Sequence, residues 1–488
     1  MPHFFESSSA SLEPIQSICC IGAGYVGGPT CAVLAWKCPD IRVTIVDISQ
    51  ERIDAWNSDD LPIFEPGLEE IVKACRGRNL FFSTDIDAAI VAADLIFVSV
   101  NMPTKTKGVG AGCAADLQYV EAATRRIALL STRSKIIIEK STVPCRTAES
   151  MRAILDATSP QPGVHFDILS DPEFLAEGTA VQDLLKPDRI LIGALATESG
   201  KIAQERLANV YATWVDRNAI ITTGLWSSEL TKLAANALLA QRVSSINLLA
   251  AICEKTGADI DEVARGCGKD SRLGPHFLKA GLGFGGSCFQ KASSETDIFN
   301  LVYLAETFNL QLVADYWRQV LVMNEWTKSS FSRTIIRHMF STVSNKKIRE
   351  SPAINIARDL LVEGAELYIY DPKVSERNIC QALGSFANLH IASSVMQAAQ
   401  QASAIVIATD WDEFKPRSNS NSNSNSNSNS SGDKSTLSSH IDWADIYADM
   451  ARPAFVFDGR GILEAATLRD IGFKVHTVGR GNAAETLG

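Results

Sequence analysis

The sequence has no apolar run long enough to form a membrane-spanning helix, which needs about 18 consecutive apolar residues. Its first residues, MPHFFESSS, lack the basic segment and apolar core of a secretory signal. With 46% hydrophobic and 21% charged residues, the composition is that of a globular protein. We therefore expect a cytoplasmic protein that does not associate with a membrane.

Paired cysteines and clustered positive charges are also missing. The eleven cysteines form no CxxC pair, and no Cys/His spacing is typical of a zinc site, so we expect reduced core residues and no metal. The net charge of −10 argues against nucleic acid as a partner, because nucleic acid is bound by clustered Lys and Arg. A small anionic ligand needs only a few converging basic residues, so that class of partner stays open.

The length of 488 residues exceeds what one ordinary core organises and predicts roughly two to four domains. An almost uninterrupted Ser/Asn tract near the C-terminal end cannot bury enough surface to become ordered, which indicates a disordered loop insertion. We expect a disordered extension over 1–16, domains over 17–224, 225–340 and 341–480, and a disordered insertion over 417–436.

A glycine-rich turn follows the first strand-like run, 17–21, and precedes a helix-like stretch and a second run that ends at Asp47. This order and spacing are typical of a dinucleotide-binding βαβ unit. Gly22 permits the tight turn, Gly24 lets the pyrophosphate approach the helix N-terminus, and Gly27 lets helix and strand pack closely. Asp47 would accept hydrogen bonds from the adenosine ribose, which favours NAD over NADP, although Arg52 weakens that preference.

Three more strand-like runs, 93–100, 135–139 and 166–170, alternate with helical stretches, as in a doubly wound parallel sheet. Ligands of such sheets lie beyond the C-terminal ends of the strands. Proline turns at strand ends are also common without any ligand. We expect the cofactor to face the loops that follow these runs, which are 101–104, 140–144 and 171–178.

A long Ala/Leu-rich stretch, 226–255, contains neither proline nor glycine and predicts a helix that connects two domains. Lys232 and Asn236 are four residues apart, so they share one face of this helix. Their apolar neighbours indicate that this face is partly buried. A second helical region is expected at about 300–340.

Residues 279–291 crowd four glycines against Cys288, which has no nearby cysteine to pair with. Glycine allows the backbone to approach a ligand closely, so the stretch predicts either a loop that holds a reactive thiol or a turn with a core cysteine. Beyond it, runs at 363–371, 402–410 and 453–458 predict a second α/β layer. No strand precedes the helix-like stretch at 354–361, so we expect this layer to lack its first strand and to keep unpaired edges.

Taken in order, six motifs resemble those of the animal UDP-glucose 6-dehydrogenases, within the UDP-glucose/GDP-mannose dehydrogenase family. The resemblance covers about 17–479 and implies two Rossmann-like α/β domains joined by a central helical domain. It also implies NAD as cofactor, UDP-glucose as substrate and a dimer-based homo-oligomer, commonly a hexamer. The motifs are IGAGYVGGPT (21–30), EKSTVP (139–144), DPEFLAEG (171–178), LTKLAAN (230–236), GFGGSCF (283–289) and FDGR (457–460).

The resemblance implies a four-electron oxidation of C6 of the glucose from alcohol to carboxylate. Cys288 would add to the aldehyde as a thiolate, because thiolate forms readily near neutral pH. Lys232 and Asn236 would hold the developing oxyanions, and Lys232 with Asp297 would hold the water that takes the first proton.

Glu177 is implied as the base for hydrolysis of the resulting thioester, with Thr142 positioning the water. The residues implied to contact the cofactor are Gly22, Gly24, Tyr25, Val26, Gly27, Asp47, Arg52, Val100, Asn101, Pro103, Thr104, Ser141, Thr142, Glu177 and Arg349. Those implied to contact the substrate are Glu173, Phe174, Leu175, Ala176, Glu177, Lys232, Asn236, Arg272, Phe277, Lys279, Phe284, Gly285, Phe289 and, from a neighbouring subunit, Arg460.

Two stretches depart from the family pattern. In the family an aspartate directly follows the lysine after Cys-Phe-Gln, whereas here residues 292–296 separate Lys291 from Asp297. Five extra helical residues would rotate the aspartate by more than a turn, so we expect it to regain its place only if they form a loop. The family also has a strand, a glycine turn and a lysine pair where this chain joins Ile348 directly to Arg349.

These departures leave three hypotheses open. The chain oxidises UDP-glucose; it acts on another nucleotide sugar, such as GDP-mannose or a UDP-N-acetylhexosamine; or it is a catalytically impaired form that still binds nucleotide or modulates an oligomer.

Overall fold

The computed structural model describes residues 14–158, 162–285, 294–339, 352–415 and 441–481. The chain forms two compact units, one of residues 1–237 with 290–318 and one of 238–289 with 319–488. The central domain predicted over 225–340 contributes residues to both units. No helix in the described ranges combines the length and apolar character needed to cross a membrane.

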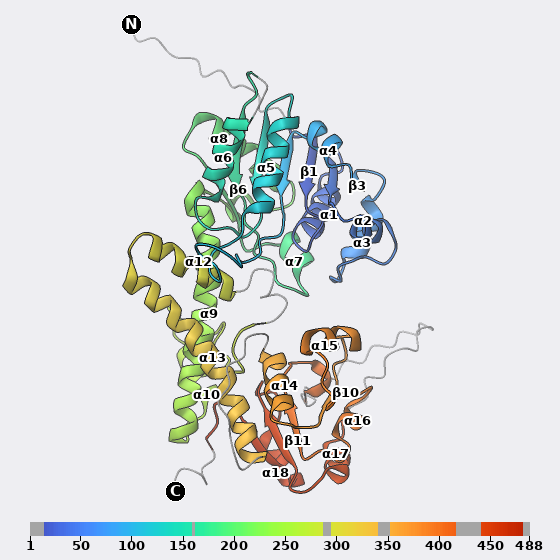
Figure 1. Cartoon of the computed structure of the whole chain (residues 1–488), viewed down its shortest axis with the longest axis vertical. Helices are drawn as coiled ribbons and strands as arrows, with labels where there is room; N and C mark the ends of the chain where they lie inside the picture. Colours follow the sequence, from blue (N-terminus) through green and yellow to red (C-terminus); the bar gives the residue numbers. More distant parts are fainter. Residues whose placement is uncertain (1–13, 159–161, 286–293, 340–351, 416–440, 482–488) are drawn as a thin grey trace, which may run out of the picture. The chain divides into compact units, whose positions relative to one another are not determined.

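An eight-stranded sheet in the order β3-β2-β1-β4-β5-β6-β7-β8 forms the centre of the first unit (Figure 1). The first six strands are parallel, in the order typical of dinucleotide-binding folds. The strands predicted from the sequence thus pair in parallel as expected, and β7, which was not among them, is antiparallel to β6. The strands are β1 (Ser17–Ile21), β2 (Arg42–Val46), β3 (Leu80–Ser83), β4 (Leu95–Val98), β5 (Lys135–Glu139), β6 (Phe166–Ser170), β7 (Ile190–Ala194) and β8 (Ile220–Gly224).

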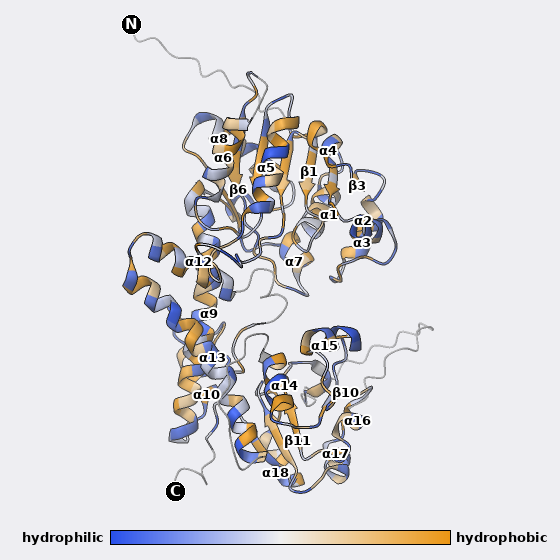
Figure 2. Ribbon diagram, in the orientation of Figure 1, coloured by the Kyte–Doolittle hydropathy of each residue, from blue (hydrophilic) through white to orange (hydrophobic). Residues whose placement is uncertain are grey.

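Helices cover both faces of this sheet. Consecutive strand residues point to opposite faces, so Cys20 packs with α1, α3 and α8 while Cys19 packs with α4, α5 and α6. Burial on both faces explains the continuous apolar runs, which Figure 2 shows as orange strands. The helices are α1 (Gly27–Lys37), α2 (Gln50–Asn57), α3 (Leu68–Cys75), α4 (Ile86–Ala92), α5 (Gln118–Leu130), α6 (Thr147–Thr158), α7 (Ala180–Leu185) and α8 (Glu198–Tyr211).

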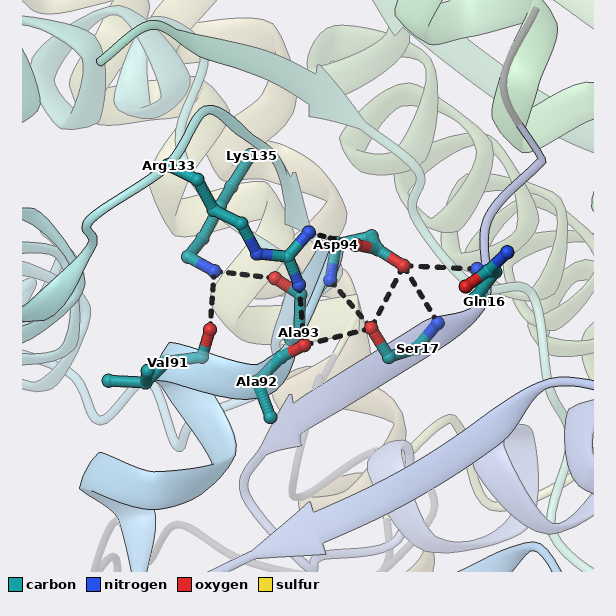
Figure 3. A network of polar contacts seen from close by, with 8 residues as sticks. All are labelled: Gln16, Ser17, Val91, Ala92, Ala93, Asp94, Arg133 and Lys135. Atoms are coloured by element: carbon teal, nitrogen blue, oxygen red, sulfur yellow. Dashed lines mark hydrogen bonds and ion pairs between the residues drawn. The ribbon is translucent and has the colours of Figure 1, made fainter.

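A polar network around Asp94 joins the starts of β1, β4 and β5 (Figure 3). Its Oδ2 accepts bonds from the backbone N–H groups of Gln16 and Ser17, at 3.0 and 2.9 Å, and its Oδ1 pairs with Arg133. The buried Lys135 ammonium donates to backbone carbonyls of the same network, and burial lowers its pKa to about 8. These groups lie at the strand ends opposite the predicted cofactor loops, so they support the fold.

The packed part of the chain begins before Ser17. Ile15 is buried in the core below one face of the sheet, and the backbone of Gln16 is held by Asp94. The disordered extension predicted through residue 16 is therefore wrong for residues 15 and 16. The tract predicted to be disordered over 417–436 lies outside the described residues.

In the described ranges, four helices lie between β8 and residue 339. The helix predicted over 226–255 is observed one residue longer at each end, and the region predicted at 300–340 is two helices separated by a turn in which Asn309 has φ +57°. Asn tolerates this left-handed conformation better than most residues. The helices are α9 (Leu225–Thr256), α10 (Ile260–Gly268), α12 (Ser294–Thr307) and α13 (Gln311–Met339).

The second unit contains a two-stranded sheet, β10-β9, and a three-stranded sheet, β11-β12-β13. All of these strands pair in parallel. The predicted runs at 363–371, 402–410 and 453–458 contain β9, β11 and β12. The elements are α14 (Pro352–Val362), β9 (Leu367–Ile369), α15 (Glu376–Leu383), β10 (Leu389–Ile391), α16 (Val395–Ala399), β11 (Ala404–Ile407), α17 (Trp443–Asp449), β12 (Phe455–Asp458), α18 (Ala465–Ile471) and β13 (Lys474–Thr477).

Within the described ranges, β9 and β11 each keep one unpaired edge, in agreement with the predicted loss of the first strand. The N–H of Leu367 donates to the carbonyl oxygen of Asn388 at 2.9 Å. Because backbone groups alternate along a strand, the N–H of Tyr368 in β9 points away from β10. The N–H of Phe455 donates to the carbonyl oxygen of Ser403 at 3.1 Å. By the same alternation, the backbone N–H of Ile405 points toward β12 and that of Val406 points away from it.

We expect the amide hydrogens of Tyr368 and Val406 to exchange with solvent at least about tenfold faster than those of Leu367 and Ile405, because unpaired edge amides lack ladder partners. Native-state hydrogen exchange resolved to single residues measures this ratio. Equal protection of both sets would show that another strand covers these edges.

Candidate active site

The turn between β1 and α1 has the geometry that a bound pyrophosphate requires. Gly22 has φ +113°, and a Cβ there would lie 2.1 Å from the carbonyl oxygen of Ser99. A Cβ on Gly27 would lie 2.2 Å from the carbonyl oxygen of Gly22. A Cβ on Gly24 would meet no atom within 4 Å, so ligand atoms have room beside this backbone. Both close contacts explain glycine at 22 and 27, and the open position fits an anion at the N-terminus of α1.

Asp47 follows β2 and is buried beside this turn. Its Oδ2 accepts from the N–H of Ala23 at 2.9 Å and pairs with Arg52, while its Oδ1 accepts from the N–H of Ser49 at 3.0 Å. Burial acts to raise the pKa of Asp47, but these hydrogen bonds and the Arg52 charge outweigh it and hold the pKa below its usual value. The carboxylate is therefore ionised and keeps lone pairs for ribose hydroxyls.

The loops after β4 and β5 lie together at the C-terminal edge of the sheet. The hydroxyl of Ser141 donates to the carbonyl oxygen of Val100 at 2.9 Å, and Thr142 beside it is half-buried. Asn101 is exposed, and the carbonyl oxygen of Pro103 accepts from a backbone N–H farther along its own loop at 2.7 Å. Thr104 pairs across the same loop in an isolated β-bridge. The predicted cofactor residues of these loops thus share one edge with the glycine turn.

The loop after β6 carries the predicted Glu173 and Glu177 in different environments. Glu173 is buried, and its Oε2 accepts from the N–H of Leu175 at 2.7 Å, whereas Glu177 is exposed. The ring of Phe174 lies under two cations, with the Arg189 guanidinium carbon at 4.0 Å and the Lys232 Nζ at 5.1 Å from its centroid. Such contacts stabilise a cation beside an aromatic face.

The buried polar cluster of this unit joins residues predicted to act together. Lys232 and Asn236 lie one turn apart on α9; the Lys232 Nζ is 3.4 Å from Glu173 Oε1, and Asn236 Nδ2 donates to Asp297 Oδ2 at 2.6 Å. The Lys232 charge also acts on Asp297. The structure therefore brings Glu173, Lys232, Asn236 and Asp297 into one site.

Asp297 reaches this site through a helix. Helix α12 begins at Ser294, so 294–296, the last three of the five extra residues, form its first turn and Asp297 follows within it. We expected the aspartate to arrive only if all five residues formed a loop, and that expectation is wrong. The helix begins within the extra residues, and its register places the carboxylate against Asn236.

The carboxyl group of Asp297 is 1% exposed and titrates near neutral pH. Burial raises its pKa from 3.8 to about 6; the Asn236 hydrogen bond and the Lys232 charge oppose this, and the Glu173 charge adds to it. A carboxylate with a pKa near the working pH suits general base catalysis.

The second unit holds the first part of the predicted glycine loop, 281–285. Asn247 of α9 accepts from the N–H of Gly281 at 2.9 Å. Asn324 of α13 accepts from the N–H of Phe284 and donates to its carbonyl oxygen, both at 2.9 Å. A Cβ on Gly283, which has φ +94°, would lie 2.4 Å from Asn324 Oδ1. Two buried asparagines thus fix this backbone, and glycine at 283 is required for the close approach.

The predicted substrate residues of this unit lie in different surroundings. The guanidinium of Arg272 pairs with Asp270 at the surface, Phe284 is buried, and Phe277 is 48% exposed with φ +61°. Gly285, with φ +146°, closes the described part of the loop.

A cluster of basic groups surrounds Asp410, which follows β11. The Nζ atoms of Lys279 and Lys415 lie 3.7 and 3.0 Å from its carboxylate, and its charge also acts on Arg460. Arg460 Nε donates to the carbonyl oxygen of Ala408 at 2.7 Å, and burial lowers the Arg460 pKa. Lysine and arginine side chains such as Lys279, Lys415 and Arg460 are the groups that bind a diphosphate.

Three predicted site residues, Cys288, Phe289 and Arg349, lie outside the described residues. Sequence reasoning missed Glu65, Asn247, Asn324 and Arg189, which contact the site loops. No pattern marks these residues, since each acts on a backbone or a ring far away in sequence. Only the helical setting of Asn247, four turns beyond the Lys232 position on the same predicted helix, offered a signal.

Three models of one family match in chain order. They describe the NAD binding domain, central domain and UDP binding domain of the UDP-glucose/GDP-mannose dehydrogenase family, and they match residues 16–215, 226–326 and 344–427.

Individual relatives match nearly the whole chain. A UDP-glucose 6-dehydrogenase of Drosophila melanogaster is 52% identical over 95% of this chain and 96% of its own. UDP-glucose 6-dehydrogenase 3 of Oryza sativa subsp. japonica is 50% identical over 95% and 97%. The structure of a UDP-glucose dehydrogenase from Pyrobaculum islandicum has a TM-score of 0.77 at 26% identity, covering 97% of this chain and 99% of its own. With an NAD-binding fold and these relatives, the chain belongs to the UDP-glucose/GDP-mannose dehydrogenase family.

Proposed function

We propose that the protein oxidises UDP-glucose to UDP-glucuronate and reduces two NAD for each sugar. The observation that carries this proposal is Asp297, which is buried against Asn236 and beside Lys232 in spite of the five extra residues before it. The relatives named UDP-glucose 6-dehydrogenase support this substrate, because they are about 50% identical across the chain. The basic cluster around Asp410 supports a diphosphate ligand.

NAD, when bound, accepts one hydride in each of the two oxidations. In the first, Asp297 and Lys232 hold a water. This water takes the C6 hydroxyl proton and passes a proton to the Asp297 carboxylate, while the C6 hydrogen leaves with its electron pair, giving the aldehyde. The Lys232 ammonium and the Asn236 amide stabilise negative charge on the C6 oxygen, and they do so effectively because their site is largely buried.

Cys288 then forms a carbon–sulfur bond to the aldehyde as thiolate, and the C6 oxygen takes a proton, which gives a thiohemiacetal. Loss of this proton and of a second hydride yields the thioester. Glu177 takes a proton from a water held by Thr142, the water attacks the thioester carbon, and the thiolate leaves. The exposed position of Glu177 supports this role, since water reaches it freely.

We also propose that the protein is a cytoplasmic homo-oligomer built from dimers, with a hexamer as the expected form. Apolar side chains exposed on α9, such as Ile252 at 57%, support an interface between copies. Light scattering on the active fraction measures the assembly, and a monomer would contradict this proposal.

A substrate panel tests the proposed function. NADH formation is measured with equal concentrations of UDP-glucose, GDP-mannose and a UDP-N-acetylhexosamine. We expect kcat/KM for UDP-glucose to exceed the other values by at least about a hundredfold, since a site built for one set of hydroxyls rejects sugars that leave buried polar groups unpaired. A higher kcat/KM for GDP-mannose than for UDP-glucose would contradict the proposed substrate.

A further inference from the structure

We propose that Glu65 is a positioning residue, which couples the cofactor-binding turn to the loop that carries Glu177. Glu65 lies in the connection between α2 and α3, where its neighbours Phe64 and Pro66 are exposed. Its own side chain is turned inward, and the residue is only 4% exposed. A carboxylate that is buried in a surface connection needs partners, and these partners identify what it holds.

The Glu65 carboxylate joins two separate segments. Its Oε1 accepts from the hydroxyl of Tyr25 at 2.5 Å and from the N–H of Gly178 at 2.8 Å, and its Oε2 accepts from the N–H of Ala180 at 3.0 Å. Tyr25 belongs to the glycine turn, whereas Gly178 and Ala180 follow Glu177. An ionised carboxylate has acceptors only, so three donors around it are well matched, and bonds to a charged group are the stronger kind.

The contacts fix the backbone on both sides of Glu177. On one side, Ala176 donates its N–H to Asp183 Oδ2 at 2.9 Å, and its carbonyl oxygen lies 3.3 Å from the Tyr25 hydroxyl. On the other side, Gly178 is held by Glu65 and has φ +85°, a conformation that glycine adopts without strain. The position of Glu177 therefore depends on Tyr25 and Glu65. A shift of the cofactor turn reaches it through the Glu65 carboxylate and through the contact of the Tyr25 hydroxyl with Ala176.

This inference rests on the proposed role of Glu177 in thioester hydrolysis, so Glu65 should affect the last step and spare the two oxidations. In Glu65→Gln an NH₂ group replaces one acceptor oxygen and faces a backbone N–H, which leaves that donor unsatisfied. The shape of the side chain is kept. The loop should then hold Glu177 less well while the buried cluster around Lys232 stays intact.

Rapid mixing with UDP-glucose and excess NAD separates these steps. We expect Glu65→Gln to form a burst of two NADH per active site at the wild-type rate, followed by steady turnover at least about tenfold slower than wild type. Intact-mass measurement should show the sugar bound as thioester during this phase. The control Glu70→Gln makes the same chemical change at an exposed position on α3 and should behave as wild type. Equal slowing of burst and steady phases, without thioester, would overturn the proposal.

Hydrogen exchange tests the coupling without any turnover. We expect NAD to slow exchange of the Gly178 and Ala180 amides several-fold in the wild-type protein, and to lose this effect in Tyr25→Phe, which removes the hydroxyl link but keeps the two bonds from Glu65 to the loop. Equal slowing by NAD in both proteins would refute the coupling. If wild-type protein does not oxidise UDP-glucose, the proposed function fails, and the same exchange measurement on Glu65→Gln still decides the role of Glu65: equal slowing by NAD in this variant and in wild type would refute it.

Discussion

Replacing Asp297 with asparagine is expected to lower kcat about 10²–10⁴-fold, the range typical of losing a general base. Asparagine preserves the size of the side chain and accepts the hydrogen bond from Asn236, but it cannot take a proton or bear the charge that pairs with Lys232. Because the fold is kept, NAD affinity should change less than about twofold. Steady-state kinetics and NAD titration measure the two effects separately.

The dependence of wild-type activity on pH should also reveal the role of Asp297. Asp297 acts as carboxylate, so kcat/KM should rise with pH through about 6 and approach a plateau above it. In Asp297→Asn the remaining activity should lose this ascending limb. A profile that keeps an identical limb in the variant would show that another group titrates.

The substitution Asp297→Asn should raise the free energy of unfolding at pH 7, although it lowers activity. The pKa of Asp297 is about 6 when folded and about 3.9 in an unfolded chain, so its contribution to stability is complete below the unfolded value and is lost as pH rises through 6. At pH 7 the wild-type protein carries this buried charge, and Asp297→Asn should be more stable by roughly 1–3 kcal/mol. The gain should disappear near pH 4.

Denaturant unfolding at both pH values measures this difference, and Asp60→Asn, an exposed residue of the same unit, serves as the control. A variant of Asp297 that is less stable at pH 7 would show that the carboxylate mainly supports the fold.

Replacing Cys288 with serine is expected to stop the reaction after the first oxidation, with overall formation of UDP-glucuronate reduced at least about 10³-fold. A serine hydroxyl is almost fully protonated at neutral pH, whereas a thiol is partly ionised and is the stronger nucleophile. At most one NADH per active site should form, with the C6 aldehyde as product.

Product analysis by mass spectrometry, together with the NADH count, measures this outcome. Cys380→Ser, on the exposed face of α15, makes the same substitution away from the site and should keep full activity. Formation of two NADH per sugar by Cys288→Ser would contradict a covalent role for the thiol.

The cofactor unit could be predicted from the sequence because its signals are local. Gly22, Gly24, Gly27 and Asp47 lie within one βαβ segment, where a Cβ at Gly22 or Gly27 would collide with backbone and Gly24 leaves room for a ligand. The long helix could also be predicted, because 226–255 contains neither proline nor glycine. Its helical spacing places Lys232 and Asn236 on one face.

The placement of Asp297 could not be predicted in this way. Counting five extra residues in a helix gave the wrong rotation, because the sequence does not reveal that the helix begins at Ser294, within the extra residues. Glu65 was missed for a related reason. Its bonds span 40 to 115 residues of sequence, and nothing in the local pattern distinguishes it from an exposed loop glutamate.

In the second unit, the strand that the family has between Ile348 and Arg349 was predicted to be absent. The strands β9 and β11 formed as predicted, because their apolar runs are intact. Among the described residues they remain in separate sheets, with Arg460 donating to the carbonyl oxygen of Ala408 beyond the end of β11. In the first unit the buried cluster of Lys232, Asn236 and Asp297 is assembled.

The most direct test of this account is the number of NADH formed for each UDP-glucose consumed by the purified wild-type protein. With limiting UDP-glucose and excess NAD, we predict a ratio of two and UDP-glucuronate as the product. Binding of UDP-glucose and NAD with no NADH formed would contradict the account and would identify a nucleotide-binding protein without catalytic activity.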